Sequence, residues 1–271
     1  MKAWSAVLVL FLVAAVAFAG GSAESSGAAN GDNSLSYVKE KGELVLGLDD
    51  SFPPMGFRGE NGEIVGFDID LATEVADRMG VKLRLQPIDW DAKVLDLNSK
   101  DIDVIWNGLT ITDDRKQQIT FSKPYIANRQ IVIVQAGSAI ATKADLDGKV
   151  VGLQLGSSAQ DAVEAEPEVL ASFSKLARYQ DNVQALLDLG VGRIDAVVVD
   201  EILGRYYIAQ KPGMYAVAKE YFAEEEYGVG FRKGDIALRN RVDAILDEMV
   251  ADGTAKKISV KWFGEDILLP R

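Results

Sequence analysis

The sequence contains no cysteine and no histidine in 271 residues. Without cysteine there is no disulfide bond, so the fold must rest on its hydrophobic core, which a chain of this length can supply. Without histidine there is no Ser–His triad, no histidine general base and no histidine metal ligand. These absences exclude many enzyme classes, and we expect neither a metal nor a cofactor.

Basic residues are also scarce. The chain has 29 Lys and Arg against 41 Asp and Glu, a formal net charge of −12. A polyanion would be repelled by this charge, which argues against nucleic acid and anionic membrane surfaces as partners. The same charge mildly favours zwitterionic or cationic ligands over acidic ones.

The N-terminus has the pattern of an export signal. Lys2 precedes an apolar run over 6–16, which ends at Ala17-Phe18-Ala19, a small-x-small cleavage pattern. A retained membrane anchor is the alternative, but the run is short for a spanning helix, which needs ~20 apolar residues. We predict a signal peptide over 1–19, cleavage after Ala19 and export to the periplasm. The absence of cysteine argues against a lipid anchor, and residues 20–34 have the composition of a flexible linker.

The segment 101–125, DIDVIWNGLTITDDRKQQITFSKPY, is the most informative stretch. A short apolar strand breaks at Asn107-Gly108, where glycine permits a turn and a close approach to a ligand. Two threonine hydroxyls follow at 110 and 112, and Asp113 is expected to cap a helical turn that carries Arg115. Such donors at the carboxyl end of a strand suit a small carboxylate. Alternatively, Arg115 is an exposed helix residue that pairs with its neighbours.

The rest of the chain alternates between strand and helix patterns. Asp68 is expected to cap a helix that Gly80 ends, and a short helix is expected to bury Val94, Leu95 and Leu97. An Asn-Gly pair predicts a hairpin turn over 60–63. Further strands are predicted at 44–48, 81–85, 130–134, 150–153, 194–200 and 228–231, and further helices at 236–250 and 254–263.

Two patterns occur twice. The segment 147–153, DGKVVGL, is similar to 42–48, GELVLGL, and 194–200, IDAVVVD, is similar to 102–105, IDVI. The repetition predicts an α/β protein with two similar β-α-β lobes.

The motif NGLTIT-DDR-FSKPY resembles the signature of the polar amino-acid-binding proteins of ABC importers, the extracellular solute-binding family 3. Matching pieces occur in the same order elsewhere, over about 42–264: LGLDDSFPPMGF, EIVGFDIDLATEVADRMG, DLDGKVVGLQLGSSA, IDAVVVD and KWFG. The resemblance implies the two-lobed periplasmic binding protein type II fold, each lobe a mixed sheet flanked by helices. It places lobe 1 at 35–124 plus 228–271, lobe 2 at 130–222, and the hinge at 125–129 and 223–227.

The same resemblance implies how a free amino acid is held. Arg115 would bind the carboxylate, together with Ser157 and Ser158 from the second lobe. Asp200 would accept the α-ammonium, assisted by the Gly108 carbonyl and the Thr110 hydroxyl. From the residues alone, Ser158 and Asp161 have capping-box spacing, and Asp200 is equally well explained as a helix N-cap.

The ligand's side chain is expected to meet a further set: Asp49, Phe52, Trp90, Asn107 and Gln154. The two aromatic residues would stack on a flat or cationic group, although buried rings mostly serve packing. Asp49 would pair with an ammonium, guanidinium or amide group. Asp at this position also occurs in glutamine-binding relatives, but Gln154 departs from the Lys of a glutamine binder. We therefore expect a basic or polar amino acid.

Together these features predict an exported receptor that is not an enzyme, is a monomer, and delivers an amino acid to a membrane permease. The alternative is an enzyme, because the scaffold also carries a periplasmic cyclohexadienyl dehydratase. Asp200 with Glu201, or Asp49 with Asp50, would then act as acid and base. A third possibility is a sensor or lytic-enzyme module, but no second apolar span or further domain follows the repeats.

Overall fold

The computed structural model describes Met1 and residues 31–271. The predicted signal peptide, apart from Met1, and residues 20–30 of the predicted linker lie outside the described residues. The helices and strands of the described residues all belong to the unit Asp32–Arg271. Helix α1 (Ser34–Lys41) begins inside the range predicted as linker, and Asp32 accepts a hydrogen bond from the backbone N–H of Ala237.

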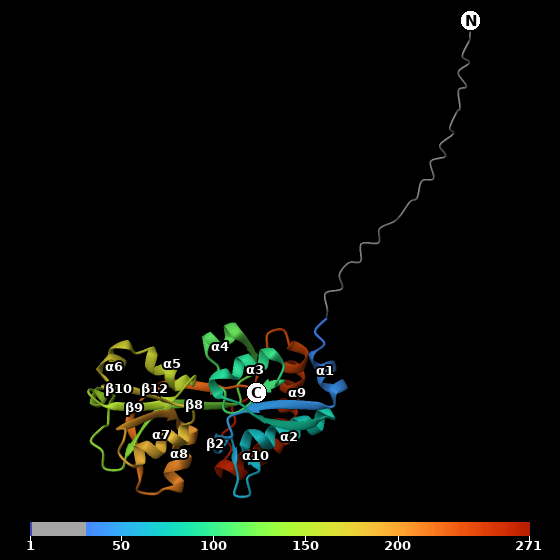
Figure 1. The fold of residues 1–271 in the computed structure, drawn as a ribbon. Helices are drawn as coiled ribbons and strands as arrows, with labels where there is room; N and C mark the ends of the chain where they lie inside the picture. Colours follow the sequence, from blue (N-terminus) through green and yellow to red (C-terminus); the bar gives the residue numbers. More distant parts are fainter. Residues whose placement is uncertain (2–30) are drawn as a thin grey trace. The chain divides into compact units, whose positions relative to one another are not determined.

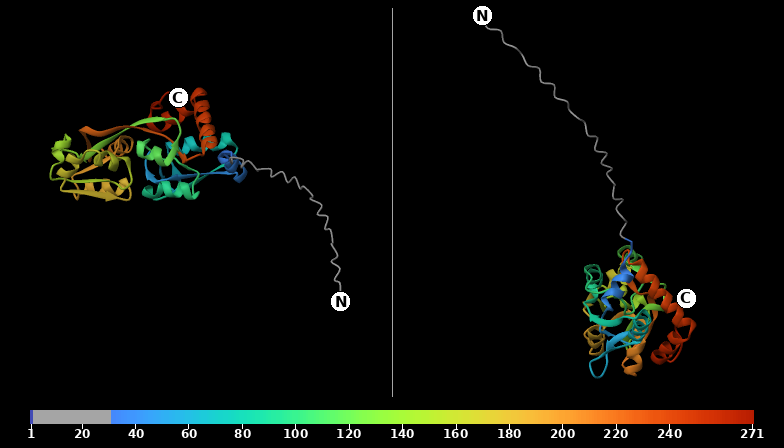
Figure 2. Two further views of the ribbon diagram at one scale, coloured as in Figure 1. Left: turned by 90° about the horizontal axis from the view of Figure 1, so that it is seen from above. Right: turned by 90° about the vertical axis from the view of Figure 1, so that its right-hand side faces the viewer.

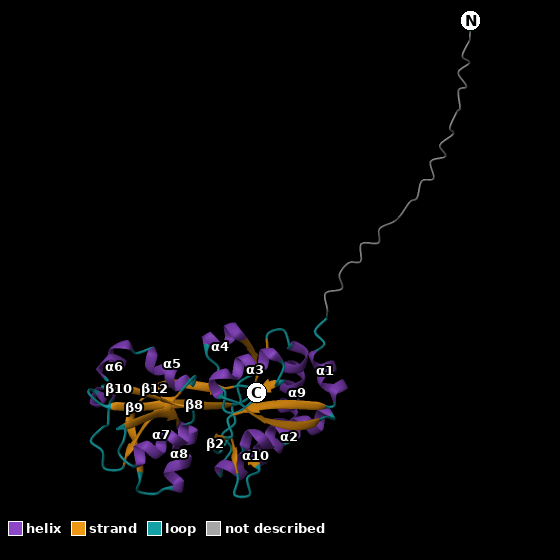
Figure 3. Ribbon diagram, in the orientation of Figure 1, coloured by secondary structure: helices purple, strands orange, loops and turns teal. Residues whose placement is uncertain are grey.

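The unit Asp32–Arg271 is built on two five-stranded sheets, each with helices on its faces (Figure 1, Figure 3). The first sheet has the order β5-β1-β6-β13-β7, and the second has the order β10-β9-β11-β8-β12. We call the part around the first sheet the first lobe and the part around the second sheet the second lobe. The strands of the first sheet are β1 (Glu43–Leu48), β5 (Lys82–Pro87), β6 (Val104–Ile105), β7 (Ile119–Phe121) and β13 (Gly230–Arg232). Those of the second are β8 (Ile126–Gln135), β9 (Val150–Gln154), β10 (Lys175–Tyr179), β11 (Ala196–Asp200) and β12 (Tyr215–Tyr227).

A small third sheet and the helices complete the two lobes. The sheet pairs β2 (Ser51–Phe52), β3 (Gly56–Arg58) and β4 (Ile64–Val65), so the hairpin turn predicted at 60–63 is confirmed. The remaining helices of the first lobe are α2 (Phe67–Met79), η1 (Trp90–Ala92), α3 (Lys93–Ser99), α4 (Asp113–Gln118), α9 (Ile236–Ala251) and α10 (Thr254–Phe263). Those of the second lobe are η2 (Lys143–Leu146), α5 (Ser158–Glu164), α6 (Pro167–Ser172), α7 (Asn182–Gly190) and α8 (Glu201–Gln210).

The two sheets repeat one pairing scheme. In each, the second strand of the order (β1 or β9) lies between two parallel neighbours, and the antiparallel pairings follow on one side. The strand that follows the repeated Ile-Asp motif is β6 in one sheet and β11 in the other. The two similar β-α-β lobes predicted from the repeated patterns are therefore confirmed.

The aspartate of each Ile-Asp motif binds the neighbouring strand. Asp103 accepts a 2.8 Å hydrogen bond from the backbone N–H of Val45, and Asp195 accepts one of 2.8 Å from that of Val150. Backbone bonds run in the opposite direction between the same two pairs. In both sheets the motif thus fixes the register between two neighbouring parallel strands.

Alternating residues of the second sheet supply two cores. Ile131, Ile133, Val197 and Val199 pack with buried residues of α7 and α8, whereas Val132, Val134, Ala196 and Val198 pack with those of α5. Since successive strand residues point to opposite faces, the unbroken apolar runs are buried on both sides. Figure 3 shows helices on both sides of these strands.

Strands β8 and β12 connect the two lobes. They pair antiparallel from Ile126 with Tyr227 to Gln135 with Tyr215, with two irregularities in register. After β12 the chain enters β13 of the first sheet, and α9 and α10 then pack against α1 and α2. Figure 2 shows the red C-terminal helices beside the blue and teal segments of the first lobe.

Candidate functional site

One cavity is lined by residues of both lobes and of the strand ends between them. All eleven residues predicted from the sequence line it: Asp49, Phe52, Trp90, Asn107, Gly108, Thr110, Arg115, Gln154, Ser157, Ser158 and Asp200. The cavity volume is about 10 Å³, which is room for about one water molecule. The lobes are therefore closed upon one another, and they must separate to admit a molecule as large as an amino acid.

The turn at Gly108 is held by a buried carboxylate. Gly108 has φ +59°, and a Cβ there would lie 2.8 Å from the Phe52 ring, so glycine is required. Its N–H donates to Asp68 Oδ2 at 2.7 Å, and the Tyr125 hydroxyl donates to the same oxygen at 3.0 Å. The prediction that Asp68 caps α2 is wrong: the N-cap is Gly66, and Asp68 lies in the first turn. Burial raises the pKa of Asp68 to about 7.

Arg115 is buried inside the cavity and not exposed on its helix, so the alternative of a surface ion pair is excluded. Its Nη1 donates to the Thr110 carbonyl at 2.9 Å, and its Nη2 donates across the lobes to the Gly156 carbonyl at 3.2 Å. No carboxylate of the described residues lies within ion-pair distance of Arg115, and burial lowers its pKa. The N-cap of α4 is Thr112, not Asp113 as predicted, and its hydroxyl accepts from the Arg115 N–H at 3.2 Å.

Ser157 and Ser158 lie at the start of α5. Ser157 is the N-cap and accepts from the Gln160 N–H, so the capping box predicted for Ser158 and Asp161 is wrong by one residue. Ser158 is thereby free of a capping role. Its hydroxyl lies 3.0 Å from that of Thr110 in the first lobe.

Asp200 precedes α8, but its side chain makes no capping hydrogen bond. Instead, Oδ1 accepts from the Tyr227 hydroxyl at 2.6 Å and from Asn128 Nδ2 at 2.7 Å. Burial, reinforced by the nearby Glu225 carboxylate, raises the pKa of Asp200 to about 7. The Asp200 carboxylate lines the cavity, and its pKa depends on the charges around it.

At the other end of the cavity, Asp49 bonds to the second lobe. It accepts from the Ser51 N–H and hydroxyl at 2.9 and 2.6 Å, and from Gln154 Nε2 at 2.7 Å. Burial raises the pKa of Asp49, and these hydrogen bonds oppose the rise. Asn182 donates to Gln154 Oε1 at 2.9 Å and so orients its amide. Phe52 and Trp90 are both largely buried.

Lys93 is a cavity neighbour that the sequence analysis missed. Leu95, predicted to be inward, is 70% exposed, whereas Lys93 is 5% exposed. Its Nζ donates to the Trp90 carbonyl at 2.8 Å and, across the lobes, to the Gly156 carbonyl at 2.9 Å. Burial lowers the pKa of Lys93 to about 7. The sequence feature that could have indicated the burial of Lys93 is its spacing. It lies four residues before Leu97, which places it on the buried face of the helix.

Glu225 and Asn128 were also missed, because they lie on the strands predicted as hinge. Both contact residues that line the cavity. Among the described residues no group of three or more acidic side chains is arranged to hold a metal ion. No helix in the described part of the chain is long and apolar enough to cross a membrane.

Residues 44–265 match the sequence model of the bacterial extracellular solute-binding proteins, family 3. The chain belongs to this family. It is 37% identical over 235 residues to the L-cystine-binding protein TcyJ of Escherichia coli (strain K12), which covers 86% of this chain and 87% of that protein. Further relatives, at 30–33% identity, are named for arginine, for lysine, arginine and ornithine, or for histidine.

Solved structures agree with the family assignment. An ABC uptake transporter substrate-binding protein from Streptococcus pneumoniae, with bound histidine, matches with a TM-score of 0.85 at 37% identity, over 89% of this chain and 99% of that one. The ancestral amino-acid-binding protein AncCDT-1, described as a precursor of cyclohexadienyl dehydratase, matches with a TM-score of 0.78 at 34% identity. The match covers 84% of this chain and 99% of that one. The two-lobed type II fold predicted from the sequence is confirmed.

Proposed function

We propose that this protein is an exported receptor of an ABC importer, which captures a free polar or basic L-amino acid between its lobes and delivers it to a membrane permease. The observation that carries the proposal is the opposed pair of charges in one closed cavity. Arg115 enters from the first lobe and Asp200 from the second. A zwitterion carries the complementary pair, so it can bond to both lobes at once and favour closure.

The α-carboxylate is assigned to Arg115, with Ser157 and Ser158. A guanidinium has a planar fork of donors that suits a carboxylate, and such charged hydrogen bonds contribute about 1.5–3 kcal/mol each. In the closed cavity two of these donors bond to carbonyls. An incoming carboxylate would compete for them as the better acceptor.

The α-ammonium is assigned to Asp200, the Gly108 carbonyl and the Thr110 hydroxyl. These three acceptors come from two segments of the chain, and two of them are held by the bonds from Tyr227 to Asp200 and from Gly108 to Asp68. A site whose acceptors are fixed before binding loses less conformational entropy when the ligand arrives.

The side chain is assigned to Phe52, Trp90, Asn107, Asp49 and Gln154. Asp49 is an acceptor, whereas the Gln154 amide both donates and accepts. This set suits a cationic, amide or second zwitterionic group better than an apolar one. The ligand would replace the bond that now joins Asp49 to Gln154.

Several further assignments belong to the same proposal. The lobes are placed at 35–124 plus 228–271 and at 130–222, with the hinge at 125–129 and 223–227, and the mature protein is a periplasmic monomer without catalytic activity. The long pairing of β8 with β12 supports a hinge at these strands.

The proposal is tested with mature protein that has been unfolded and refolded to remove co-purified ligand. A thermal-shift panel would contain the common amino acids with ornithine, citrulline and cystine. A receptor should be stabilised by its ligand through mass action. A shift with one amino acid or a small related group supports the proposal. No shift with any of them would contradict it, and turnover of prephenate or arogenate would favour the dehydratase instead.

A further inference from the structure

Glu225 on β12 lies at a junction of the two lobes and the strands between them. Its Oε2 accepts from Asn128 Nδ2 at 3.0 Å and from Gln130 Nε2 at 2.9 Å, both on β8. The hydroxyls of Thr110, from the first lobe, and Ser158, from the second, lie 3.0 and 3.2 Å from the same oxygen. A single carboxylate oxygen therefore joins three parts of the molecule.

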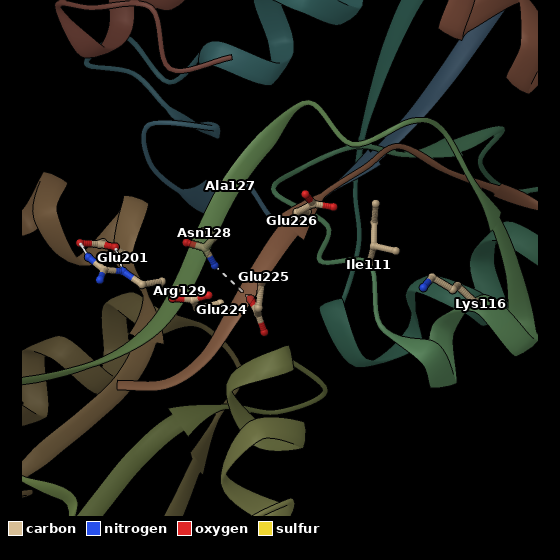
Figure 4. Close-up of a pocket in the computed structure, with 9 residues that line it drawn as sticks. All are labelled: Ile111, Lys116, Ala127, Asn128, Arg129, Glu201, Glu224, Glu225 and Glu226. Carbon is tan, nitrogen blue, oxygen red and sulfur yellow. Dashed lines mark hydrogen bonds and ion pairs between the residues drawn. The ribbon is translucent and has the colours of Figure 1, made fainter. Parts of the chain in front are cut away.

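The neighbouring glutamates do not share this position. Successive strand residues point to opposite faces, so Glu224 and Glu226 point away from the side that Glu225 faces. Both are exposed, whereas Glu225 is half-buried. Figure 4 shows Asn128 of β8 and Glu225 of β12 joined by a hydrogen bond, at a groove that Glu224 and Glu226 also line.

Glu225 also shares a donor with Asp200. Asn128 Nδ2 donates to Asp200 Oδ1 at 2.7 Å and to Glu225 Oε2 at 3.0 Å, so the two carboxylates are adjacent. The other charged or titratable groups that act on Asp200 are Arg115 and the Tyr227 hydroxyl. Glu225 is thus the second negative charge at the end of the cavity where Asp200 lies.

We propose that Glu225 is a positioning residue for ligand capture: it fixes the Thr110 and Ser158 hydroxyls in the closed arrangement and adds negative charge behind Asp200. The inference rests on the proposed function and deepens it. Thr110 is assigned to the ligand's α-ammonium and Ser158 to its α-carboxylate. Because both hydroxyls contact Glu225, this carboxylate sets the distance between them. Because the bonds to Thr110 and Ser158 require both lobes, opening the lobes breaks at least one of them.

The test compares Glu225→Gln with Glu224→Gln and Glu226→Gln, which remove the same charge from the same strand. Calorimetry would measure the Kd of the amino acid with the largest thermal shift, between pH 5 and 8. In Glu225→Gln we expect Kd at pH 7 to rise at least tenfold. We also expect the pH at which binding weakens to move downward, because Asp200 ionises more easily without a neighbouring charge. The two control variants should stay within about twofold of wild type, as expected for exposed charges.

A second variant, Glu225→Asp, distinguishes the effect of the charge from the effect of the side-chain length. It keeps the negative charge but shortens the side chain, so we expect weaker binding with a smaller change in the pH midpoint. Wild-type affinity and pH midpoint in Glu225→Gln would overturn the inference and leave the receptor function standing. If wild-type protein binds no amino acid, the proposed function fails, and the inference fails with it.

Discussion

The Asp49 carboxylate of the first lobe accepts a 2.7 Å hydrogen bond from the Gln154 amide of the second lobe. This bond closes the end of the cavity opposite Asp200, where we assign the ligand's side chain. A ligand that enters there must offer Asp49 a donor at least as good as the amide it displaces. The bond therefore sets a minimum requirement for selectivity.

Replacing Asp49 by Asn should weaken binding of a cationic ligand at least tenfold, because the charge that pairs with the ligand is lost. Binding of an uncharged polar ligand should fall much less. Asp50→Asn is the matched control, since Asp50 pairs instead with Arg58 at 2.6 Å, at the surface. Calorimetry with the amino acid identified in the thermal-shift panel would measure both affinities. Equal losses of affinity in Asp49→Asn and Asp50→Asn would contradict the assignment of Asp49 to the site.

Arg115→Met should raise Kd at least 100-fold, about 2.8 kcal/mol at 1.4 kcal/mol per tenfold. The unfolding free energy should change by less than about 1 kcal/mol, because removing a buried charge that has no ionic partner also removes its desolvation cost. Lys116→Met, on the exposed side of the same helix, is the control. Denaturant unfolding and calorimetry measure both quantities, and unchanged affinity would contradict the assignment of Arg115.

Ligand affinity should depend on pH through Asp200. Its pKa of about 7 means that the carboxylate gains a proton as the pH falls below 7, whereas the ligand ammonium interacts favourably with the charged form. Binding should therefore be strongest above pH 7, and Kd should rise by up to tenfold per pH unit below it. Asp200→Asn should bind weakly at every pH. A Kd that is constant from pH 8 to 5 in the wild type would contradict this role.

An aromatic contact outside the cavity should also affect affinity. Phe57 on β3 and Tyr206 on α8 belong to different lobes, and their ring centroids are 5.9 Å apart. Aromatic pairs contribute about 0.5–1.5 kcal/mol beyond their buried area. Each Ala variant should raise Kd by about 2- to 13-fold, and the double variant should add little more. Additive effects would show that the rings do not stabilise closure together.

Local patterns were sufficient to predict several strands of both sheets and the repetition of the two lobes, whereas β7 and β10 were not predicted. The repeated Ile-Asp motif is one of these local patterns: its aspartate binds the adjacent strand in both lobes. The residues around the cavity were predicted from the family resemblance. Helix caps were less well predicted. Thr112 and Ser157 cap their helices one residue before the predicted positions, since several neighbouring polar side chains could serve and local spacing does not choose among them.

Residues whose role depends on distant partners could not be predicted. Lys93 is buried because its ammonium reaches the Gly156 carbonyl of the other lobe, 63 positions away. Glu225 stands in a run of three glutamates, and only strand pairing decides which of them turns inward. The Asp68 carboxylate binds Gly108, 40 positions away, and not the start of its own helix. In each case the partner is fixed by tertiary structure and leaves no local pattern.

The most direct measurement is a crystal structure of the mature protein with the amino acid that gives the largest thermal shift. We expect one ligand molecule between the lobes, with its carboxylate within hydrogen-bond distance of the Arg115 guanidinium and its ammonium within hydrogen-bond distance of Asp200. The Asp49–Gln154 bond should be replaced by bonds to the ligand's side chain. A ligand bound elsewhere, or in the cavity with its carboxylate turned away from Arg115, would contradict the assignment of Arg115 and Asp200 as the groups that bind the amino acid.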